Sequence, residues 1–144
     1  MSVAFFANRM ILAALLGMMS AQLLKVFFVW ISDRVLDWSL LTTSGGMPSS
    51  HTAAVVALAV SIGRLYSWNS AAFSISLVNA VIVMYDSAGV RRSAGDQARI
   101  LNIMITQFPD LQELQREQIR EILGHTPIEV LAGAALGLIM GNLV

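Results

Sequence analysis

Apolar residues form four long runs along the chain, and polar stretches separate these runs. The first run covers residues 8–31 and is interrupted by Arg9, Gln22 and Lys25. As a helix rising about 1.5 Å per residue, it is long enough to cross about 30 Å of hydrocarbon. Because the run continues to Trp30, past any plausible small-residue cleavage site, the pattern favours a transmembrane helix over a cleaved signal peptide.

Three further runs are apolar over most of their length: residues 52–66, 68–88 and 126–144. The first of these would span only about 22 Å as a helix, so we expect its N-terminal end to begin below the membrane surface, inside protein. The last carries Gly133, Gly137 and Gly141, whose spacing of four makes a ridge that allows close helix approach. The pattern therefore predicts an all-α integral membrane bundle of about four transmembrane helices, in one domain covering residues 1–144.

One extended polar region, residues 86–125, separates the third run from the fourth. Apolar residues recur in it at alternating steps of four and three, as on one helix face: Ala94, Ala98, Leu101, Ile105 and Phe108. A rougher stripe follows the break at Pro109: Leu111, Leu114, Ile119, Ile122 and Leu123. We predict two amphipathic helices here, lying at the membrane interface or folded back over the bundle.

The arginines predict which side of the membrane each loop faces. Two spans separate the polar loops 32–50 and 86–125, so both loops must share one side. These loops hold six of the arginines: Arg34, Arg91, Arg92, Arg99, Arg116 and Arg120. Only Arg9 and Arg64 fall on the other side. The positive-inside rule therefore predicts cytoplasmic loops and outer termini, and the lack of a transit-like N-terminus favours a bacterial plasma membrane.

Composition narrows the class of protein. Hydrophobic residues make up 56% of the chain and charged residues 12%, whereas soluble domains carry about 25% charged residues, so an ordinary soluble domain is excluded. Nine basic residues balance nine acidic ones, and without a net positive field we expect no nucleic-acid partner. The chain has no cysteine, which excludes disulfides, thiolate nucleophiles and thiolate metal sites. No metal or cofactor is predicted.

The segment before the second apolar run has the residues of a helix start. Ser49 or Ser50 is suited to cap the helix, and His51 then falls in its first turn. A helix N-terminus offers unpaired N–H groups and the positive end of the helix dipole, which together suit a phosphate. Alternatively, the serines only cap a membrane helix and His51 faces lipid headgroups.

The fourth run begins with a second histidine. Thr126 fits an N-cap, a proline follows, and Glu129 stands at the third helical position, which is a capping box. Capping alone can explain Glu129, but it does not explain His125. The chain's two histidines thus both stand at helix starts on the same predicted side. If the imidazoles of His51 and His125 face one anion site, they can divide covalent attack and protonation between them.

Basic residues are available to bind a phosphoryl group. Lys25 lies inside the first span with Gln22 on the same face, and an ionisable residue in a membrane helix indicates a functional site. Alternatively, Lys25 extends to the water at the membrane surface. The planar guanidinium could also hold phosphate oxygens at four positions: Arg34, Arg91, Arg92 and Arg120. Alternatively, Asp86 forms an ordinary salt bridge with Arg91 or Arg92.

Four motifs follow one another between Lys25 and the end of the chain. They are Gly45-Gly46-Met47-Pro48-Ser49-Ser50-His51; Val83-Met84-Tyr85-Asp86 with Gly89-Val90-Arg91-Arg92; Gly95 with Gln97-Ala98 and Leu101-Asn102; and Leu123-Gly124-His125-Thr126-Pro127 with Glu129-Val130. Together they resemble the divergent branch of the type 2 phosphatidic acid phosphatases. The wider superfamily includes lipid phosphatases, bacterial acid phosphatases and vanadium haloperoxidases. The resemblance implies a helical fold and phosphatase chemistry without a metal.

The resemblance also implies a role for each matching residue. His125 would be the nucleophile that forms a phosphohistidine, Glu129 would orient it, and His51 would protonate the leaving oxygen. The phosphoryl oxygens would be bound by the side chains of Lys25 and Arg34 and by the backbone around Ser49 and Ser50.

The chain departs from the superfamily pattern at several positions. Pro-Ser-Ser-His replaces Pro-Ser-Gly-His, and Glu129 stands where Asp is usual. The third conserved motif of the superfamily has a Ser-Arg pair ahead of its histidine, and Ile119 occupies the place of that arginine here, so Arg120, Arg91 or Arg92 would have to replace it. The lipid enzymes of the superfamily usually have six membrane helices, so four spans suggest a reduced core that a homodimer completes.

The leading interpretation is an integral-membrane phosphatase acting on a lipid phosphomonoester or diphosphate, such as phosphatidate, phosphatidylglycerophosphate or a polyprenyl diphosphate. The runner-up is a non-enzymatic membrane protein that uses the same anion site to bind a lipid headgroup or to organise other membrane enzymes. A small channel or transporter fits less well, because the spans hold no deep ionisable residue besides Lys25.

Overall fold

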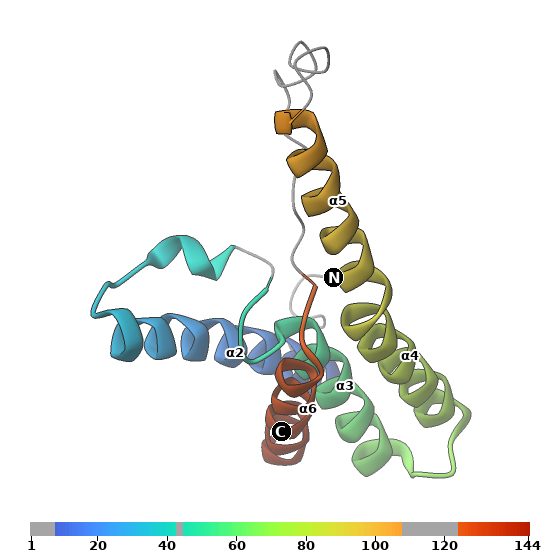
Figure 1. Cartoon of the computed structure of the whole chain (residues 1–144). Coiled ribbons are helices and arrows are strands. Elements are labelled where there is room, and N and C mark those ends of the chain that lie inside the picture. The colour runs from blue at the N-terminus through green and yellow to red at the C-terminus, as the bar shows by residue number, and fades with distance from the viewer. Residues whose placement is uncertain (1–7, 43–44, 108–123) are drawn as a thin grey trace.

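Four apolar helices form a bundle in the structure, a computed structural model that describes residues 8–42, 45–107 and 124–144 (Figure 1). They are α2 (Arg9–Asp33), α3 (Ser50–Tyr66), α4 (Ala71–Ala88) and α6 (Pro127–Leu143). A short 3₁₀ helix, η1 (Trp38–Leu41), follows α2, and an amphipathic helix, α5 (Val90–Gln107), follows α4. The described residues contain no strand. The predicted all-helical membrane bundle is thus confirmed, and every predicted run corresponds to one helix.

Each of the four apolar helices begins at a residue whose side-chain oxygen accepts a backbone N–H from the first turn. These N-caps are Asn8, Ser49, Ser70 and Thr126. Such caps satisfy donors that a helix start otherwise leaves unpaired. The predicted capping box of α6 is present in full, with Thr126 and Glu129 each accepting from the other's backbone.

Helix α3 lies between α2 and α6, and small residues set the close approach on both sides. Gly17 of α2 faces the carbonyl of Ala53, and an added Cβ there would lie 2.8 Å from that oxygen. On α6, a Cβ at Gly137 would lie 2.7 Å from the same oxygen, and Gly133 and Gly141 meet α3 in the same way. The glycine ridge predicted from the sequence is therefore the surface along which α6 packs on α3.

Replacing Gly137 by valine tests this packing. The new side chain would meet backbone of α3 rather than a flexible side chain, so we expect the bundle to lose about 1–3 kcal/mol of stability. Ala135→Val is the matched control, because Ala135 is exposed on another face of α6. Thermal unfolding in detergent, followed by loss of helicity, measures both variants. Equal midpoints for the two variants would contradict the packing described here.

The distribution of side-chain sizes is the reverse of that in a soluble protein. The buried core consists largely of small residues such as Ala53, Ala57 and Ala80, whereas Ile75 and Ile82 on α4 are 72% and 60% exposed. Two helical stretches, Arg9–Asp33 and Ala71–Ile105, are long and apolar enough to cross a membrane, and α6 is a shorter apolar helix. Small residues between helices and large apolar residues outside are the arrangement expected when lipid is the solvent.

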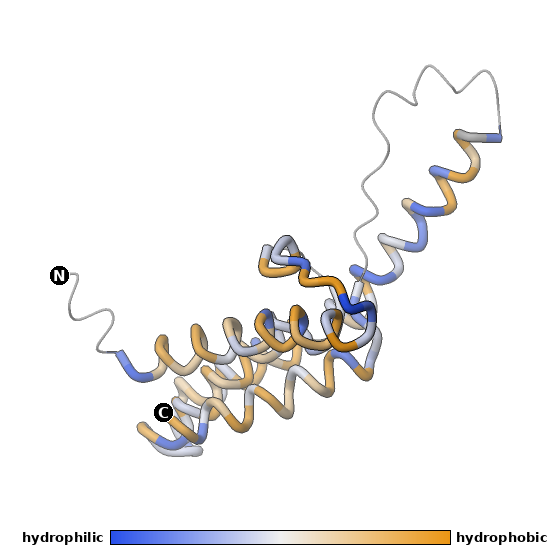
Figure 2. Tube along the Cα trace, turned by 90° about the vertical axis from the view of Figure 1, so that its left-hand side faces the viewer, coloured by the Kyte–Doolittle hydropathy of each residue, from blue (hydrophilic) through white to orange (hydrophobic). Residues whose placement is uncertain are grey.

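The two ends of the bundle differ in polarity (Figure 2). The start of α2 and the end of α6 lie at one end, where Arg64 of α3 donates hydrogen bonds to the last carbonyls of α6. The described parts of the two polar connections, residues 34–42 with 45–49 and residues 89–107 with 124–126, lie at the other end, as the four-span pattern predicts.

Helix α5 departs from one expectation. It confirms the predicted amphipathic pattern as far as Ile105, but it projects beyond the bundle in nearly the direction of α4 and does not fold back over it (Figure 1). The reason is local: the break at Gly89 is small, because its N–H still bonds to the Tyr85 carbonyl and its carbonyl accepts from Ser93. Phe108 and the second predicted amphipathic stripe lie outside the described residues.

Candidate functional site

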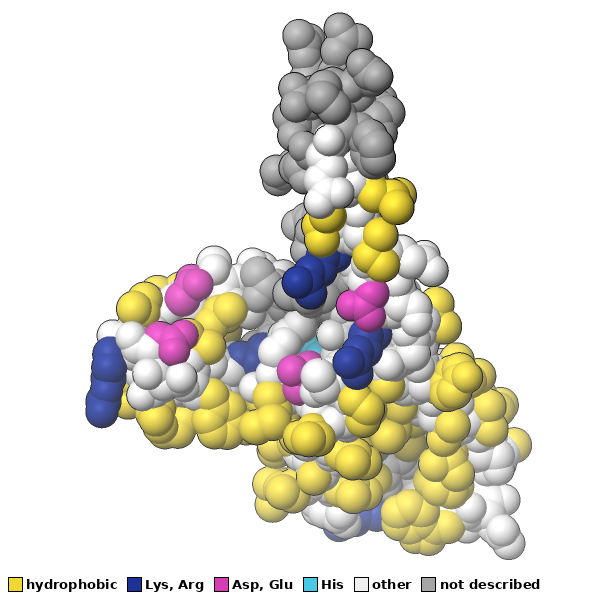
Figure 3. Space-filling model, in the orientation of Figure 1, with side chains coloured by type: hydrophobic (Ala, Val, Ile, Leu, Met, Phe, Trp, Pro, Cys, Tyr) yellow, Lys and Arg dark blue, Asp and Glu magenta, His cyan; other side chains and the backbone are white. Residues whose placement is uncertain are grey.

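The starts of α3 and α6 meet the junction of α4 and α5 at the polar end of the bundle. On this face, basic and acidic side chains gather around a recessed histidine, and the large apolar surface begins below them (Figure 3). These three segments hold His51, His125 and Arg91, which are among the predicted site residues.

The segment before α3 contacts α6, and it thereby places the N-terminus of α3 beside α6. Ser49 is fully buried, its hydroxyl accepts the N–H of Thr52 at 3.4 Å, and its own N–H donates to the Glu129 carbonyl at 3.0 Å. Ser50, the first residue of α3, is also buried. Since the first N–H groups of a helix have no partner within it, this buried N-terminus offers donors to an anion.

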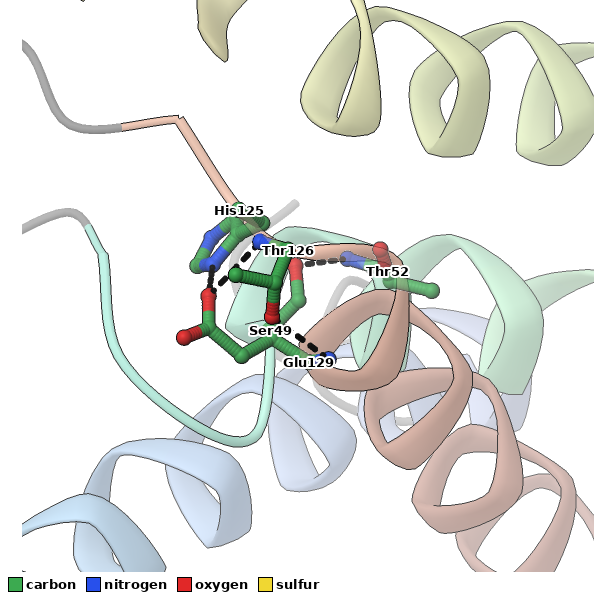
Figure 4. A network of polar contacts seen from close by, with 5 residues as sticks. All are labelled: Ser49, Thr52, His125, Thr126 and Glu129. Carbon is green, nitrogen blue, oxygen red and sulfur yellow. Dashed lines mark hydrogen bonds and ion pairs between the residues drawn. The ribbon is translucent and has the colours of Figure 1, made fainter.

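His125 is held in one orientation by Glu129 (Figure 4). The two side chains face one another with Nδ1 and Oε2 3.0 Å apart, and the same Oε2 accepts the Thr126 N–H at 3.1 Å. With Nδ1–H as the donor to the carboxylate, the lone pair of His125 lies on Nε2. Glu129 thus caps α6 and orients His125 with one oxygen, so the two explanations considered for it are compatible.

The backbone at the start of α6 is fixed as firmly as the side chain. The N–H of His125 donates to the Ser87 carbonyl at 3.1 Å, and the His125 side chain is only 6% exposed. Gly124 lies so close to the backbone of Arg92 that no side chain would fit there. The α4–α5 junction therefore determines where His125 stands.

His51 is the second residue of α3 and precedes the predicted apolar run 52–66. Partial desolvation lowers the pKa of His51, and Arg91, His125 and Lys25 lower it further through their charges. Three positively charged or chargeable groups thus lie within electrostatic reach of His51 at this end of the bundle. A bound phosphate would act in the opposite direction and favour protonated His51.

Lys25 does not extend to water. Its side chain is buried within the bundle, and its Nζ has no hydrogen-bond partner among the described residues. Its Cδ lies beneath Gly46 of the segment before α3, whose positive φ of 75° favours glycine. Glu129 acts on Lys25 electrostatically, so the buried amine lies within electrostatic reach of the carboxylate that orients His125.

The four predicted arginines do not behave alike. Arg91 pairs with Asp86 at 2.7 Å, as one alternative anticipated, although it still influences His51. Arg92 contributes its backbone at Gly124, while its side chain is exposed. Arg34 caps the exposed end of α2, about 13 Å beyond Lys25 along the helix, and is not brought to the cluster. Arg120 lies outside the described residues.

Two residues of this region escaped the sequence analysis. Thr52 is fully buried, and its hydroxyl has no partner in the described part of the chain. Ser87 anchors His125 through a backbone carbonyl, a contact for which no sequence signal exists. Among the described residues, no three His, Asp or Glu side chains are placed to hold a metal ion.

The site contains residues of the motifs that resemble the divergent PAP2 branch, and comparison with known protein families tests that resemblance. The model of the divergent PAP2 family matches residues 6–140. The chain belongs to the divergent PAP2 family. It is also 40% identical over 144 aligned positions to the uncharacterized membrane protein YuiD of Bacillus subtilis strain 168, covering 92% of this chain and 91% of that relative. No solved structure matches the chain.

This PAP2-family membrane protein therefore has a bundle whose polar end combines three features. A buried helix N-terminus offers backbone donors, a buried amine has no partner among the described residues, and a histidine is oriented by a carboxylate. The first two of these features favour an oxyanion over a neutral ligand.

Proposed function

We propose that the protein is an integral-membrane phosphatase that hydrolyses a lipid phosphomonoester or diphosphate, of the phosphatidate, phosphatidylglycerophosphate or polyprenyl diphosphate class. The observation that carries the proposal is buried His125, whose Nδ1 is held by Glu129, a carboxylate that also acts electrostatically on Lys25. The Lys25 amine is buried without a hydrogen-bond partner among the described residues. An oriented imidazole with such an amine within electrostatic reach of its carboxylate is suited to attack phosphorus and to hold the charge that develops.

The reaction has two steps. Nε2 of His125 attacks phosphorus, the bond between phosphorus and the lipid oxygen breaks, and protonated His51 gives its proton to that oxygen. Water then attacks the phosphohistidine while neutral His51 takes up its proton, which releases phosphate and frees Nε2. Lys25 and the backbone N–H groups around Ser50, at the start of α3, bind the phosphoryl oxygens throughout, whereas the N–H of Ser49 stays bonded to the Glu129 carbonyl. No step needs a metal ion.

The arrangement of charges supports a cytoplasmic active site in a bacterial plasma membrane. The site lies at the end of the bundle that holds four of the six arginines in the described residues, and the positive-inside rule assigns that end to the cytoplasm. We also propose that a second copy completes the reduced core, since the bundle has four apolar helices where the lipid enzymes of the superfamily usually have six.

Phosphate release from purified protein tests the activity. Folded protein in detergent with a chelator present is expected to release phosphate from at least one member of a lipid-phosphate panel, and rapid quenching should trap phosphate on the peptide that contains His125. Protein that unfolds cooperatively yet stays inert towards the whole panel would overturn the proposal.

A non-catalytic headgroup-binding or scaffold protein is the second candidate. It is favoured by the ion pair of Arg91 with Asp86, which engages one of the arginines that could replace the missing third-motif residue. Vanadate separates the two functions, because it mimics the trigonal-bipyramidal transition state. A phosphatase should bind vanadate more tightly than phosphate, whereas a headgroup-binding protein should show no such preference.

A further inference from the structure

A groove lies between α2 and η1, beside the cluster that contains Lys25. It has a volume of about 420 Å³ and is lined by Met18, Met19, Gln22, Leu23 and Leu41. This volume lies within the range of about 300–1,000 Å³ found for small-molecule sites. Its lining is almost entirely apolar, although one amide, that of Gln22, takes part in it.

Gln22 joins the two walls of the groove. Its Nε2 donates to the Leu41 carbonyl at 3.1 Å, which attaches η1 to α2. The other lining residues, Met18, Met19, Leu23 and Leu41, are apolar. Because a polar group buried without a hydrogen bond is costly, such a lining favours a ligand segment that has no hydrogen-bonding groups.

The groove adjoins the phosphate site. Met18, Gln22 and Lys25 follow one another at steps of four and three, so they lie on one stripe of α2. Met18 lies about 10 Å deeper in the membrane-spanning helix than Lys25. The chain that leaves η1 then passes over Lys25 at Gly46 before α3 begins. A ligand with its anionic end at Lys25 would therefore direct an apolar tail along the groove.

We propose that this groove binds the hydrocarbon chain of the lipid phosphate, at the segment nearest the headgroup. This inference rests on the proposed function, and it assigns substrate selection to α2 and η1. The hydrocarbon chain enters the groove from the bilayer and so moves from one apolar medium to another. Its binding free energy therefore comes from packing contacts with the groove and not from the hydrophobic effect. Its effect is therefore to position the phosphate and to distinguish long chains from short ones.

Filling the groove tests this assignment. Met18→Trp and Leu23→Trp are expected to lower kcat/KM for dioleoyl phosphatidate at least about tenfold more than kcat/KM for dihexanoyl phosphatidate, since about 1.4 kcal/mol of lost positioning gives that ratio. Ile75→Trp is the control, because it adds the same bulk on the exposed face of α4, which does not line the groove. Equal losses for both chain lengths, or the same effect from Ile75→Trp, would overturn the assignment.

A second measurement does not depend on turnover. A phosphatidate carrying a diazirine near the headgroup end of its chain is expected to label the peptides that contain Met18 to Leu23 and Leu41. Excess dioleoyl phosphatidate should compete, and dioleoyl phosphatidylcholine should not. Competed labelling in a protein without phosphatase activity would refute the proposed hydrolysis but keep the groove, whereas uncompeted labelling over all lipid-facing helices would refute the groove in an active enzyme.

Discussion

His125→Ala is expected to abolish phosphate release, with a loss of at least about a thousandfold in kcat, because the variant lacks the nucleophile of the first step. The backbone N–H that bonds to Ser87 remains, and so does the capping of α6 by Glu129. The bundle should therefore keep its helicity and nearly its unfolding midpoint. Phosphate release in detergent, together with thermal unfolding of the same sample, measures both quantities.

His51→Ala is expected to impair catalysis in a different way, so comparing it with His125→Ala distinguishes the roles of the two histidines. If His51 protonates the leaving oxygen, its loss slows the first step about 10²–10⁴-fold on an alkyl phosphate but little on p-nitrophenyl phosphate, whose leaving group needs no proton. With that substrate the first step still proceeds while the second lacks its base, so a burst of p-nitrophenol should precede slow turnover and phosphohistidine should accumulate on His125. Equal slowing of the first step by His51→Ala on both leaving groups, or undiminished turnover by His125→Ala, would contradict the assigned roles.

Helix ends and helix packing could be predicted from the sequence because both depend on neighbouring residues. The capping box of Thr126 and Glu129 is complete within four residues, and the glycine ridge of α6 needs only a helix of small residues beside it. The burial of Lys25 could not be predicted. The side chain is covered because the segment around Gly46 passes over it; if that segment ran elsewhere, the amine could extend to the membrane surface. That path depends on contacts between residues far apart in the chain.

The candidate site shows the same division. The two helix starts and their histidines follow from local motifs, but the contribution of each arginine depends on tertiary structure. The resemblance implied that Arg34 binds phosphate together with Lys25, yet α2 carries Arg34 to an exposed end. Arg91 entered the neighbourhood of His51 because α4 and α5 are nearly continuous at Gly89. Sequence spacing along one helix therefore did not predict which arginines lie near the site, because the site is formed by residues of several helices.

Lys25→Met is expected to raise stability while it removes anion binding. Methionine is similar to lysine in length, so the bundle loses an unpartnered polar group without gaining a large cavity. Burying such a group costs about 1–3 kcal/mol, and its removal should raise the unfolding midpoint by several degrees. The lost hydrogen bond to the phosphoryl oxygens should lower kcat/KM by about 10–100-fold, since bonds to charged groups contribute about 1.5–3 kcal/mol.

Opposite changes in stability and binding separate a ligand-binding lysine from a structural one. Vanadate should raise the unfolding midpoint of the wild-type protein and leave that of Lys25→Met unchanged, because only a ligand bound to the folded state stabilises it. Arg9→Met is the matched control: it removes one basic charge from the exposed start of α2, and it should alter neither stability nor the vanadate response. A less stable Lys25→Met that still responds to vanadate would mean that the amine holds the bundle together and another group binds the phosphate.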